Sequence, residues 1–353
     1  MTSSPSAGGG NFFEDFRPGQ VIEHWPARTL TDADQAIYTA LFGARHAPQN
    51  SLVFAKALGL PARPLDDLLV FHIIFGKTVQ DVSLNAIANL GYADCRFLVP
   101  VYSGDTLHAR TEVIGVRENA NRESGIVYVR SRGFNQHGEE VLTFARWVMV
   151  RKRTAAAEVP AATVPDLPKF VPSQSLQVAV SKGIGSELRG QSGGTRFFDD
   201  YKAGDRIDHA DGVTVEESEH MMATRLYHNN ARVHFNAHSE RAGRFGKRIV
   251  YGGHVISIAR AISFNGIENA YFVAGINAGR HVAPCFAGDT VYAWSEIVDK
   301  APLGTNGNWG ALRLRTLATK DQSCAGFPDK LPDGTFHPSV ILEFDYWVVV
   351  PRG

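Results

Sequence analysis

A dense polar segment in the second half of the chain combines residue types that can move protons. Residues 227–238 read YHNNARVHFNAH, and the sequence Tyr-Gly-Gly follows at 251–253. The imidazole of His234 can take and return a proton near neutral pH. Glycine at the start of a helix lets bare backbone N–H groups approach a carbonyl oxygen and stabilise the negative charge that develops there. A reaction that passes through an enolate needs these two functions and little else.

Two other interpretations of this segment stay open. Histidine and asparagine before a helix often serve as caps and turn formers. His228, His234 and His238 could instead bind a metal ion, because a spacing of four on a helix can place two imidazoles on one ion. No Glu lies between His234 and His238, as a zinc hydrolase would have, and no third ligand is obvious. We therefore expect no metal site.

An internal repeat indicates which elements position these residues. Residues 12–24 and 197–209 share six identities in thirteen positions, where random pairing would give about one. The sequence RFLVPVYSGDTLHA at 96–109 likewise matches RHVAPCFAGDTVYA at 280–293. Matches nearer the end of the chain occur at a larger offset, which predicts an insertion around residues 301–334. The chain is therefore a duplicated domain.

The repeat divides the 353 residues into four parts. A tail at 1–11 is expected to be disordered, and a first domain follows at 12–152. The linker at 153–194 is rich in Pro, Gly and Ser, which favours an extended connector over a core element. The second domain spans 195–353, so each domain has the size of an ordinary compact unit.

Both domains show the same order of elements. A Thr or acidic start is typical of helix N-termini and predicts helices over 31–42 and 216–227, and a longer apolar helix is clearest at 253–264. Alternation of apolar and polar residues then predicts half-exposed strands, at 106–116, 125–134, 141–150, 290–298, 311–320 and 340–350. A buried helix followed by an antiparallel meander makes an α+β unit, and two such units could pair their sheets edge to edge.

The two copies differ at the residues that could do chemistry. His234 corresponds to Gln49 in the first copy, and the glycine turn at 251–253 corresponds to Asp66-Asp67-Leu68. Only the second copy therefore combines an imidazole, amides and a glycine turn, and we expect one working site.

The stretch from Tyr227 to His234, followed eighteen residues later by Gly252, resembles the hydratase motif of the MaoC-like family. That motif is an aromatic residue, then D-x-N-P-x-H, then a small-residue turn that opens the central helix of a hotdog fold. The Gly-Asp-Thr turns at 104–106 and 288–290 are typical of the same family. Within it, the resemblance over most of the chain is greatest to the mesaconyl-CoA hydratases, which are double-hotdog proteins.

The resemblance implies an α+β tandem double hotdog in which the second domain is catalytic and the first, degenerate domain shapes the acyl pocket. His234 falls on the motif histidine and Gly252 on the glycine of the oxyanion hole. Asn229 replaces the motif aspartate, and Arg232 replaces the motif proline. A neutral amide cannot act as a base, so we expect Asn229 to hold the attacking water while His234 moves the protons.

The implied activity is the reversible hydration of mesaconyl-CoA to β-methylmalyl-CoA. The free carboxylate of this substrate needs a guanidinium partner in the pocket, and we predict Arg232 for that role, with Arg225 and Arg280 as alternatives. The full set of predicted substrate-binding residues is Arg232, Tyr251, Gly253 and Asn230. A general R-specific enoyl-CoA hydratase, or a silent acyl-CoA binder or thioesterase relative, stays as an alternative.

Composition excludes several other classes of protein. The 36 basic and 36 acidic side chains give no net charge, so we expect no nucleic-acid partner. No apolar run is long enough to span a membrane, and the N-terminus lacks a secretory signal. Three widely spaced cysteines fit the reducing cytoplasm. Dinucleotide and P-loop motifs are missing, so we expect a small acyl-CoA thioester as partner, no cofactor beyond the CoA of the substrate, and optional homo-oligomerisation.

Overall fold

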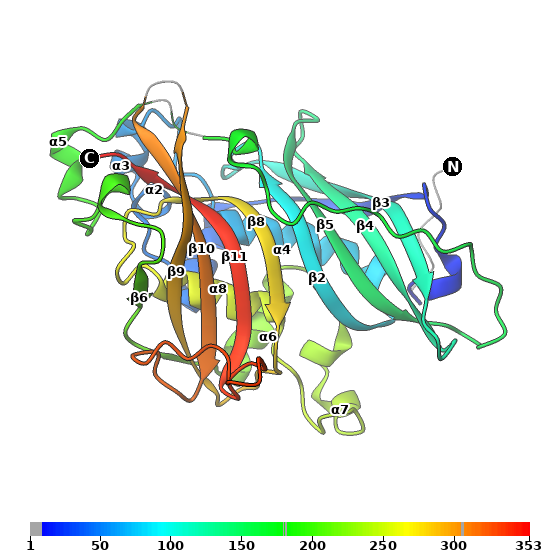
Figure 1. Ribbon diagram of the computed structural model, residues 1–353. Coiled ribbons are helices and arrows are strands. Elements are labelled where there is room, and N and C mark those ends of the chain that lie inside the picture. Colours follow the sequence, from blue (N-terminus) through cyan, green and yellow to red (C-terminus); the bar gives the residue numbers. More distant parts are fainter. Residues whose placement is uncertain (1–8, 179, 181, 305–306) are drawn as a thin grey trace.

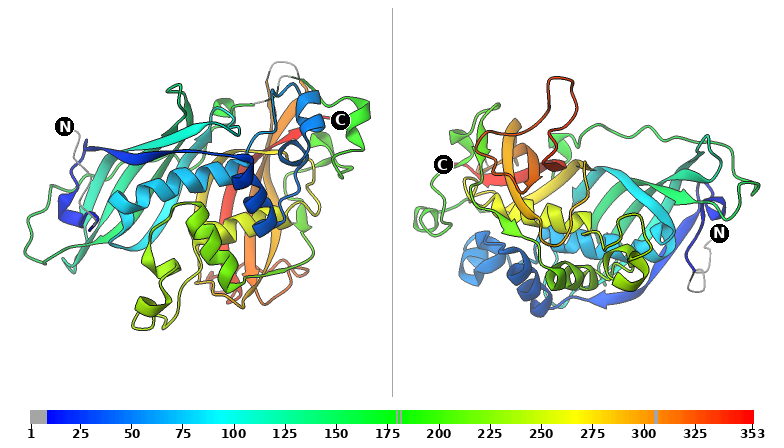
Figure 2. Two further views of the ribbon diagram at one scale, coloured as in Figure 1. Left: turned by 180° about the vertical axis from the view of Figure 1, so that it is seen from behind. Right: turned by 90° about the horizontal axis from the view of Figure 1, so that it is seen from below.

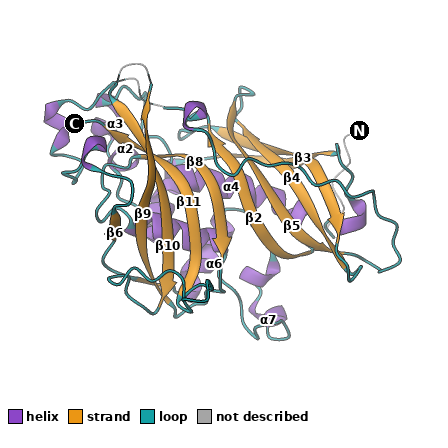
Figure 3. Cartoon of the chain, in the orientation of Figure 1, coloured by secondary structure: helices purple, strands orange, loops and turns teal. Residues whose placement is uncertain are grey.

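The computed structural model describes residues 9–178, 180, 182–304 and 307–353, and it shows two similar halves side by side (Figure 1). In each half, long antiparallel strands form one layer and helices form another (Figure 3). Within the described residues, no helix is long and apolar enough to cross a membrane.

The first half has five strands and one long buried helix, α4. Its α-helices are α1 (Asp32–Phe42), α2 (Ala47–Asn50), α3 (Leu52–Ala57) and α4 (Asp67–Thr78), and a π-helical turn, η2 (Val79–Ser83), continues α4. Its strands are β1 (Val21–Thr29), β2 (Ala86–Phe97), β3 (Thr106–Glu118), β4 (Ser124–Phe134) and β5 (Glu140–Arg151).

The second half repeats this plan around helix α8. Its α-helices are α6 (Glu217–Leu226), α7 (Ala237–Glu240) and α8 (Gly252–Ile262). Its strands are β6 (Arg206–Asp208), β7 (Val213–Thr214), β8 (Phe272–His281), β9 (Thr290–Leu303), β10 (Trp309–Lys320) and β11 (Val340–Pro351). The connector between the halves carries a short 3-10 turn, η3 (Ser173–Ser175), and the short helix α5 (Ser186–Arg189).

All these strands form one antiparallel sheet, in the order β1-β3-β4-β5-β2-β8-β11-β10-β9-β6, with β7 paired to β9. Outward from its centre the sheet runs β2-β5-β4-β3-β1 on one side and β8-β11-β10-β9-β6 on the other. These are equivalent strands in the same order, as a duplication requires. The halves join where Cys95 pairs with Ile276 and Arg96 with Gly275. The predicted α+β class and the edge-to-edge pairing of two sheets are confirmed.

The two central helices lie on the same face of the continuous sheet (Figure 2). Ten of the twelve residues of α4 are buried, and so are ten of the eleven residues of α8. Burial of apolar surface on this scale is the main driving force of folding. Helices α4 and α8 therefore form the core of the two halves, and this packing fixes the positions of their N-termini.

Several residues that recur in the repeat have structural roles. His24 bonds to Asp81 at 2.7 Å and to Thr111 at 2.8 Å, and its twin His209 bonds to the Asn265 backbone oxygen and to Ser295. Each histidine thereby ties the edge of its sheet to the end of its central helix. Recurrence in both copies thus marks architecture, whereas divergence marks the site.

The structure corrects two details of the sequence-based description. Strands β2 and β8, which join the halves, were not predicted. The insertion is confined to the connection between β10 and β11, residues 321–339, where the first half has only residues 135–139. The predicted range of 301–334 was wrong because it includes the end of β9 and all of β10.

The connector and the tail also differ from expectation. The connector is extended over most of its length, but Val171 and Leu188 are buried in a cluster with Trp347, so part of it belongs to a core. The Trp347 indole donates a hydrogen bond to the Val171 backbone oxygen at 3.0 Å. Most of the predicted tail, residues 1–8, lies outside the described residues, but Asn11 is ordered and donates its amide to the Asp81 backbone oxygen at 2.9 Å.

Candidate active site

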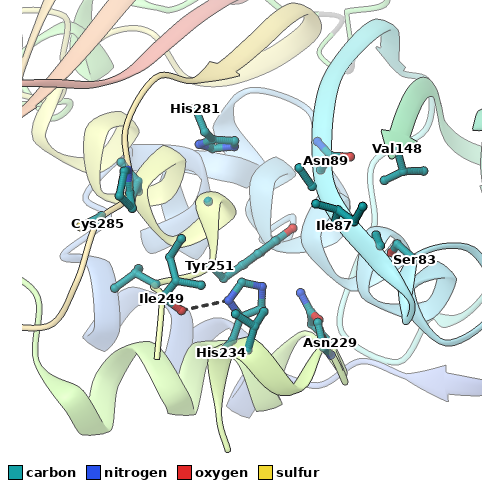
Figure 4. A pocket seen from close by; sticks show the side chains of 18 of the residues that line it. Ser83, Ile87, Asn89, Val148, Asn229, His234, Ile249, Tyr251, His281 and Cys285 are labelled. Carbon is teal, nitrogen blue, oxygen red and sulfur yellow. Dashed lines mark hydrogen bonds between the residues drawn. The ribbon is translucent and has the colours of Figure 1, made fainter. Parts of the chain in front are cut away.

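A cavity of about 470 Å³ lies between the two halves, and both halves line it. The first half contributes the end of α4, the π-helical turn and the adjoining parts of β2 and β5. The second half contributes the turn after α6, the start of α8 and the end of β8. Figure 4 shows these groups around one space, with Ser83, Ile87, Asn89 and Val148 facing His281 and Cys285. The pairing of the two sheets therefore creates the site.

The imidazole of His234 faces this cavity from the short turn η5 (Arg232–His234). Its Nδ1 lies 3.0 Å from the backbone oxygen of Ile249, which can only accept a hydrogen bond. The ring proton is therefore on Nδ1, and Nε2 keeps a free lone pair. Burial lowers the pKa of His234 to about 4, so the ring is a neutral base at physiological pH.

Asn229 lies beside His234 on the floor of the cavity (Figure 4). Its side-chain oxygen accepts the Ala231 backbone N–H at 3.0 Å, which fixes the orientation of the amide and leaves Nδ2 as the available donor. A water molecule could accept from Nδ2 of Asn229 while it donates to Nε2 of His234. The available donor on Asn229 and the available acceptor on His234 are therefore the two groups that the predicted water would need.

The turn that carries Asn229 is held against the first half of the chain. A side chain at Gly76 of α4 would place its Cβ only 1.8 Å from the backbone oxygen of Tyr227. Glycine at this position thus lets α4 approach the end of α6, next to Asn229. The first half therefore positions the segment that carries Asn229 as well as lining the cavity.

Helix α8 presents its N-terminus to the cavity at Gly252. The first backbone N–H groups of a helix have no partner within it, and the N-cap residue Tyr251 makes no side-chain cap here. A Cβ at Gly252 would lie 2.4 Å from two atoms of the His281 ring, and a Cβ at Gly253 would lie 2.3 Å from the Tyr251 ring. Both glycines are therefore required, and the bare N–H groups can bind a developing oxyanion.

The equivalent helix start in the first copy is blocked by its own side chains. Asp66 caps α4, with its carboxylate accepting the Leu68 N–H at 2.9 Å, and Asp67 accepts the Val273 N–H at 2.8 Å. Gln49, the counterpart of His234, donates its amide to the Tyr271 backbone oxygen at 3.0 Å. Among the described residues, the first copy thus has a bonded amide where the second has His234, and a side-chain cap where the second has a glycine turn, which agrees with a single working site.

Comparison with known proteins agrees with this geometry. Residues 4–166 match a family model described as mesaconyl-CoA hydratase. Over 97% of both chains, the sequence is 56% identical to a β-methylmalyl-CoA dehydratase of Chloroflexus aurantiacus. It is 52% identical to a mesaconyl-CoA hydratase of Cereibacter sphaeroides, over 97% of this chain and 98% of that one. The chain belongs to the mesaconyl-CoA hydratase family.

Solved structures support the same assignment. A crystal structure of a MaoC domain protein dehydratase from Chloroflexus aurantiacus superposes with a TM-score of 0.96 at 55% identity, covering 99% of this chain and all of that one. A double-hotdog protein of Mycobacterium tuberculosis superposes with a TM-score of 0.72 at 24% identity, over 97% of this chain and 98% of that one. The second likeness concerns the fold alone, and it agrees with the predicted tandem double hotdog.

Not every predicted site residue of this family member lines the cavity. Tyr251 does, and its ring centre lies 5.5 Å from that of His234. Gly253 lies behind it and makes room for the Tyr251 and His72 rings. Asn230 is turned away and donates its amide to Gln80.

The arginine predictions do not agree with the structure. Arg232 is exposed and is not among the residues that line the cavity, because the turn η5 directs Val233 and His234 inward instead. Arg225 is exposed on α6, and Arg280 is exposed and packs over the Phe336 ring. The two arginines that do line the cavity are Arg146 and Arg244.

Sequence reasoning missed Arg146, although one signal was available. The offset that aligns the ends of the two copies pairs Arg146 with Tyr346, so this position also diverges. The Arg146 side chain is fully buried, donates to Thr78 at 2.7 Å and lies 4.2 Å over the Phe75 ring. Burial lowers its pKa to about 10, which leaves the guanidinium charged at neutral pH.

The metal interpretation of the histidine segment finds no support. Among the residues that the structure describes, no group of three or more His, Cys, Asp or Glu side chains could hold a metal ion. His234 faces the cavity, whereas His228 and His238 are exposed.

Proposed function

We propose that the chain catalyses the reversible hydration of mesaconyl-CoA to β-methylmalyl-CoA. The observation that carries this proposal is the shared cavity of a neutral histidine, with its Nε2 lone pair free, and an uncapped helix N-terminus. These are the base and the oxyanion site that addition of water to an enoyl thioester requires. Family membership at 56% and 52% identity supports the same activity.

The steps follow from the positions of three residues. The Gly252 N–H polarises the thioester carbonyl, and Asn229 holds a water molecule against Nε2 of His234. As the water oxygen bonds to the β-carbon, His234 takes its proton and the π electrons move onto the thioester oxygen as an enolate. His234 then returns that proton to the α-carbon, so one water is added and no redox change occurs. The steps as proposed use no metal or redox cofactor, and CoA is part of the substrate.

The cavity has the charge that this substrate needs. In mesaconyl-CoA the β-carbon also carries the free carboxylate, so an anion lies beside the attacking, partly hydroxide-like water. Arg146 forms no ion pair with any described residue, its Nε has no hydrogen-bond partner there, and no described residue lining the cavity is acidic. A buried unpaired cation is costly unless an anion joins it. We therefore assign the carboxylate to Arg146 in place of Arg232.

Asn89 lies on β2, which pairs with the strand β5 that carries Arg146, and it adds neutral hydrogen-bonding groups to the cavity wall (Figure 4). Both of its side-chain polar atoms are buried without a partner among the described residues. The amide can donate to the substrate carboxylate next to the Arg146 guanidinium. Together they supply the paired, hydrogen-bonded environment that a desolvated carboxylate requires.

The CoA part of the substrate fits the open side of the cavity. Arg244 and Phe245 line it there and are exposed, and residues 241–248 read RAGRFGKR. We propose that this basic segment contacts the phosphates of CoA. Exposed Lys and Arg side chains attract phosphate through a screened Coulomb interaction.

The test is a panel of purified CoA esters, with the loss of enoyl-thioester absorbance as the signal. We expect turnover of mesaconyl-CoA that exceeds turnover of crotonyl-CoA and octenoyl-CoA. Faster turnover of the two simple esters would indicate a general R-specific hydratase. Tight binding without turnover, or release of CoA detected by a thiol reagent, would contradict the hydratase proposal.

We also propose a cytoplasmic location, with self-association beyond the chain optional. All three cysteines are buried free thiols, which suits a reducing compartment. The two hotdog halves already pair within one chain. Light scattering of the purified protein would measure the oligomer directly.

A further inference from the structure

His281, at the end of β8, enters the cavity next to the oxyanion helix. Two of its ring atoms, Cε1 and Nε2, lie 2.4 Å from where a Cβ of Gly252 would be. Its Nε2 is buried and has no hydrogen-bond partner among the described residues. An unsatisfied buried polar group costs about 1–3 kcal/mol, so an imidazole here needs a reason other than packing.

The duplication shows that packing alone does not require a histidine. The repeat that pairs residues 96–109 with 280–293 places Phe97 opposite His281. The degenerate half thus keeps an apolar ring of similar shape where the working half has an imidazole. This divergence coincides with the loss of the base at Gln49 and of the glycine turn at Asp66–Asp67.

We infer that His281 is a second oxyanion donor, whose Nε2–H binds the thioester oxygen together with the Gly252 N–H. The inference rests on the proposed hydration and adds a catalytic residue to it. The donor strengthens its hydrogen bond as negative charge grows on the oxygen, and no covalent bond forms or breaks at His281. Preorganised donors at the site of developing charge usually contribute more to such catalysis than any other single effect.

The protonation state of His281 suits this role. Burial, with a smaller contribution from the nearby His234, lowers the pKa of His281 to about 4. The ring is therefore neutral at physiological pH and can donate without transferring its proton. A neutral imidazole beside a helix N-terminus is well matched to polarising a carbonyl group.

Substitutions at His281 can distinguish a role as hydrogen-bond donor from a role in packing alone. His281→Phe, which installs the ring of the first copy, should lower kcat about 100-fold, the usual effect of losing one oxyanion donor, and change KM less than about threefold. His281→Gln places an amide N–H near the original Nε2 and should recover about tenfold of that loss, whereas His281→Asn, whose shorter amide mimics Nδ1, should not. His46→Phe is the matched control, since His46 is buried outside the cavity, and should keep full activity.

Infrared spectroscopy gives a readout that packing alone would not move. His234→Ala holds an enoyl-CoA with slow turnover, so the stretch of an isotope-labelled thioester carbonyl can be recorded in the bound state. We expect this stretch to shift to lower wavenumber on binding, and the shift to shrink in the His234→Ala, His281→Phe double variant. An unchanged shift, or full kcat in His281→Phe, would overturn the inference.

The two proposals can fail separately. If wild-type protein does not hydrate mesaconyl-CoA, the proposed function is wrong. In that case the carbonyl stretch of bound crotonyl-CoA could still be compared between the protein with His281 and the His281→Phe variant. A carbonyl shift that depends on His281 would support the second donor even then.

Discussion

Nδ1 of His234 is hydrogen-bonded to the backbone oxygen of Ile249 at 3.0 Å, three residues before Gly252, the proposed oxyanion donor. This bond does two things at once. It puts the ring proton on Nδ1, which leaves Nε2 as the base, and it ties the base to the chain segment that enters helix α8. The separation of the proposed base from the proposed oxyanion donor therefore depends on the three-residue segment from Ile249 to Gly252.

Loss of the proposed base His234 should reduce turnover, whereas loss of the matched side chain Gln49 in the first copy should not. His234→Ala should reduce kcat about 100-fold or more, the usual scale for a lost general acid or base. Gln49→Ala, at the matched position of the first copy, should change kcat little because Gln49 bonds to backbone outside the cavity. Steady-state kinetics with mesaconyl-CoA give kcat for both variants. Equal losses of kcat in the two variants would contradict a site in the second copy alone.

The pH dependence of kcat/KM should report the depressed pKa of His234. Burial lowers that pKa to about 4, so the neutral base is lost only as the pH falls through about 4, well below the usual 6.5. Asn229→Asp places a carboxylate beside the ring, which favours the imidazolium and should move the acid limb to higher pH. Profiles that coincide for wild type and variant would remove residue 229 from the proton path.

The identity of the carboxylate partner can be decided with two arginine variants. Arg146→Met should lower kcat/KM for mesaconyl-CoA by about 100-fold, because the loss of a charged hydrogen-bonding partner costs about 3 kcal/mol. Crotonyl-CoA lacks the carboxylate, so its turnover should change little. Arg232→Met is the control and should leave both substrates nearly unaffected, since Arg232 is exposed. Parallel losses on both substrates in Arg146→Met would point to folding instead, and a selective loss in Arg232→Met would restore the sequence-based prediction.

The basic segment at residues 241–248 should strengthen the binding of CoA esters. Arg244→Ala is expected to raise KM severalfold for every CoA ester and to leave kcat nearly constant, because the phosphates lie far from the reacting carbons. The effect should diminish at high ionic strength, since exposed charges are screened. A KM that is unchanged at low salt would exclude Arg244 from the CoA site.

Asp67, at the N-terminus of α4 in the first copy, should lower the free energy of unfolding at alkaline pH. Burial and the neighbouring Asp66 raise the pKa of Asp67 from 3.8 to about 8. The unfolded chain releases this proton near pH 4 and the folded chain near pH 8, so the free energy of unfolding falls as the pH rises between these values. Asp67→Asn keeps an acceptor for the Val273 N–H and removes the charge, so it should stabilise the protein by about 1 kcal/mol or more at pH 8.5, a Tm gain of about 1–2 °C or more.

The contrast with low pH provides the check on that prediction. At pH 4 the gain should vanish, because Asp67 then keeps its proton in the folded state. The exposed linker substitution Asp166→Asn should leave Tm unchanged at both values. A gain of equal size at pH 4 and pH 8.5 would show that the charge of Asp67 is not responsible.

The duplication, the α+β class, most strands and the candidate site residues that lie close together in the chain could all be predicted from the amino-acid order alone. His234, Asn229 and Gly252 lie within 24 residues of one another, and the divergence between copies marks them without any structure. Helix periodicity and strand alternation are local properties, so the elements that hold these residues could also be predicted.

The other walls of the cavity depend on contacts between residues that are far apart in the chain. Arg146 and Asn89 come from β5 and β2 of the other half, and they meet His234 because β2 pairs with β8. That contact spans more than a hundred residues and leaves no local pattern in the sequence. Arg232 was a natural prediction because it is adjacent to His234 in the chain, but the η5 turn directs adjacent side chains to different sides. Proximity along the chain points to His234 as the base, whereas Arg146, the proposed partner of the carboxylate, reaches the cavity only because two distant strands pair.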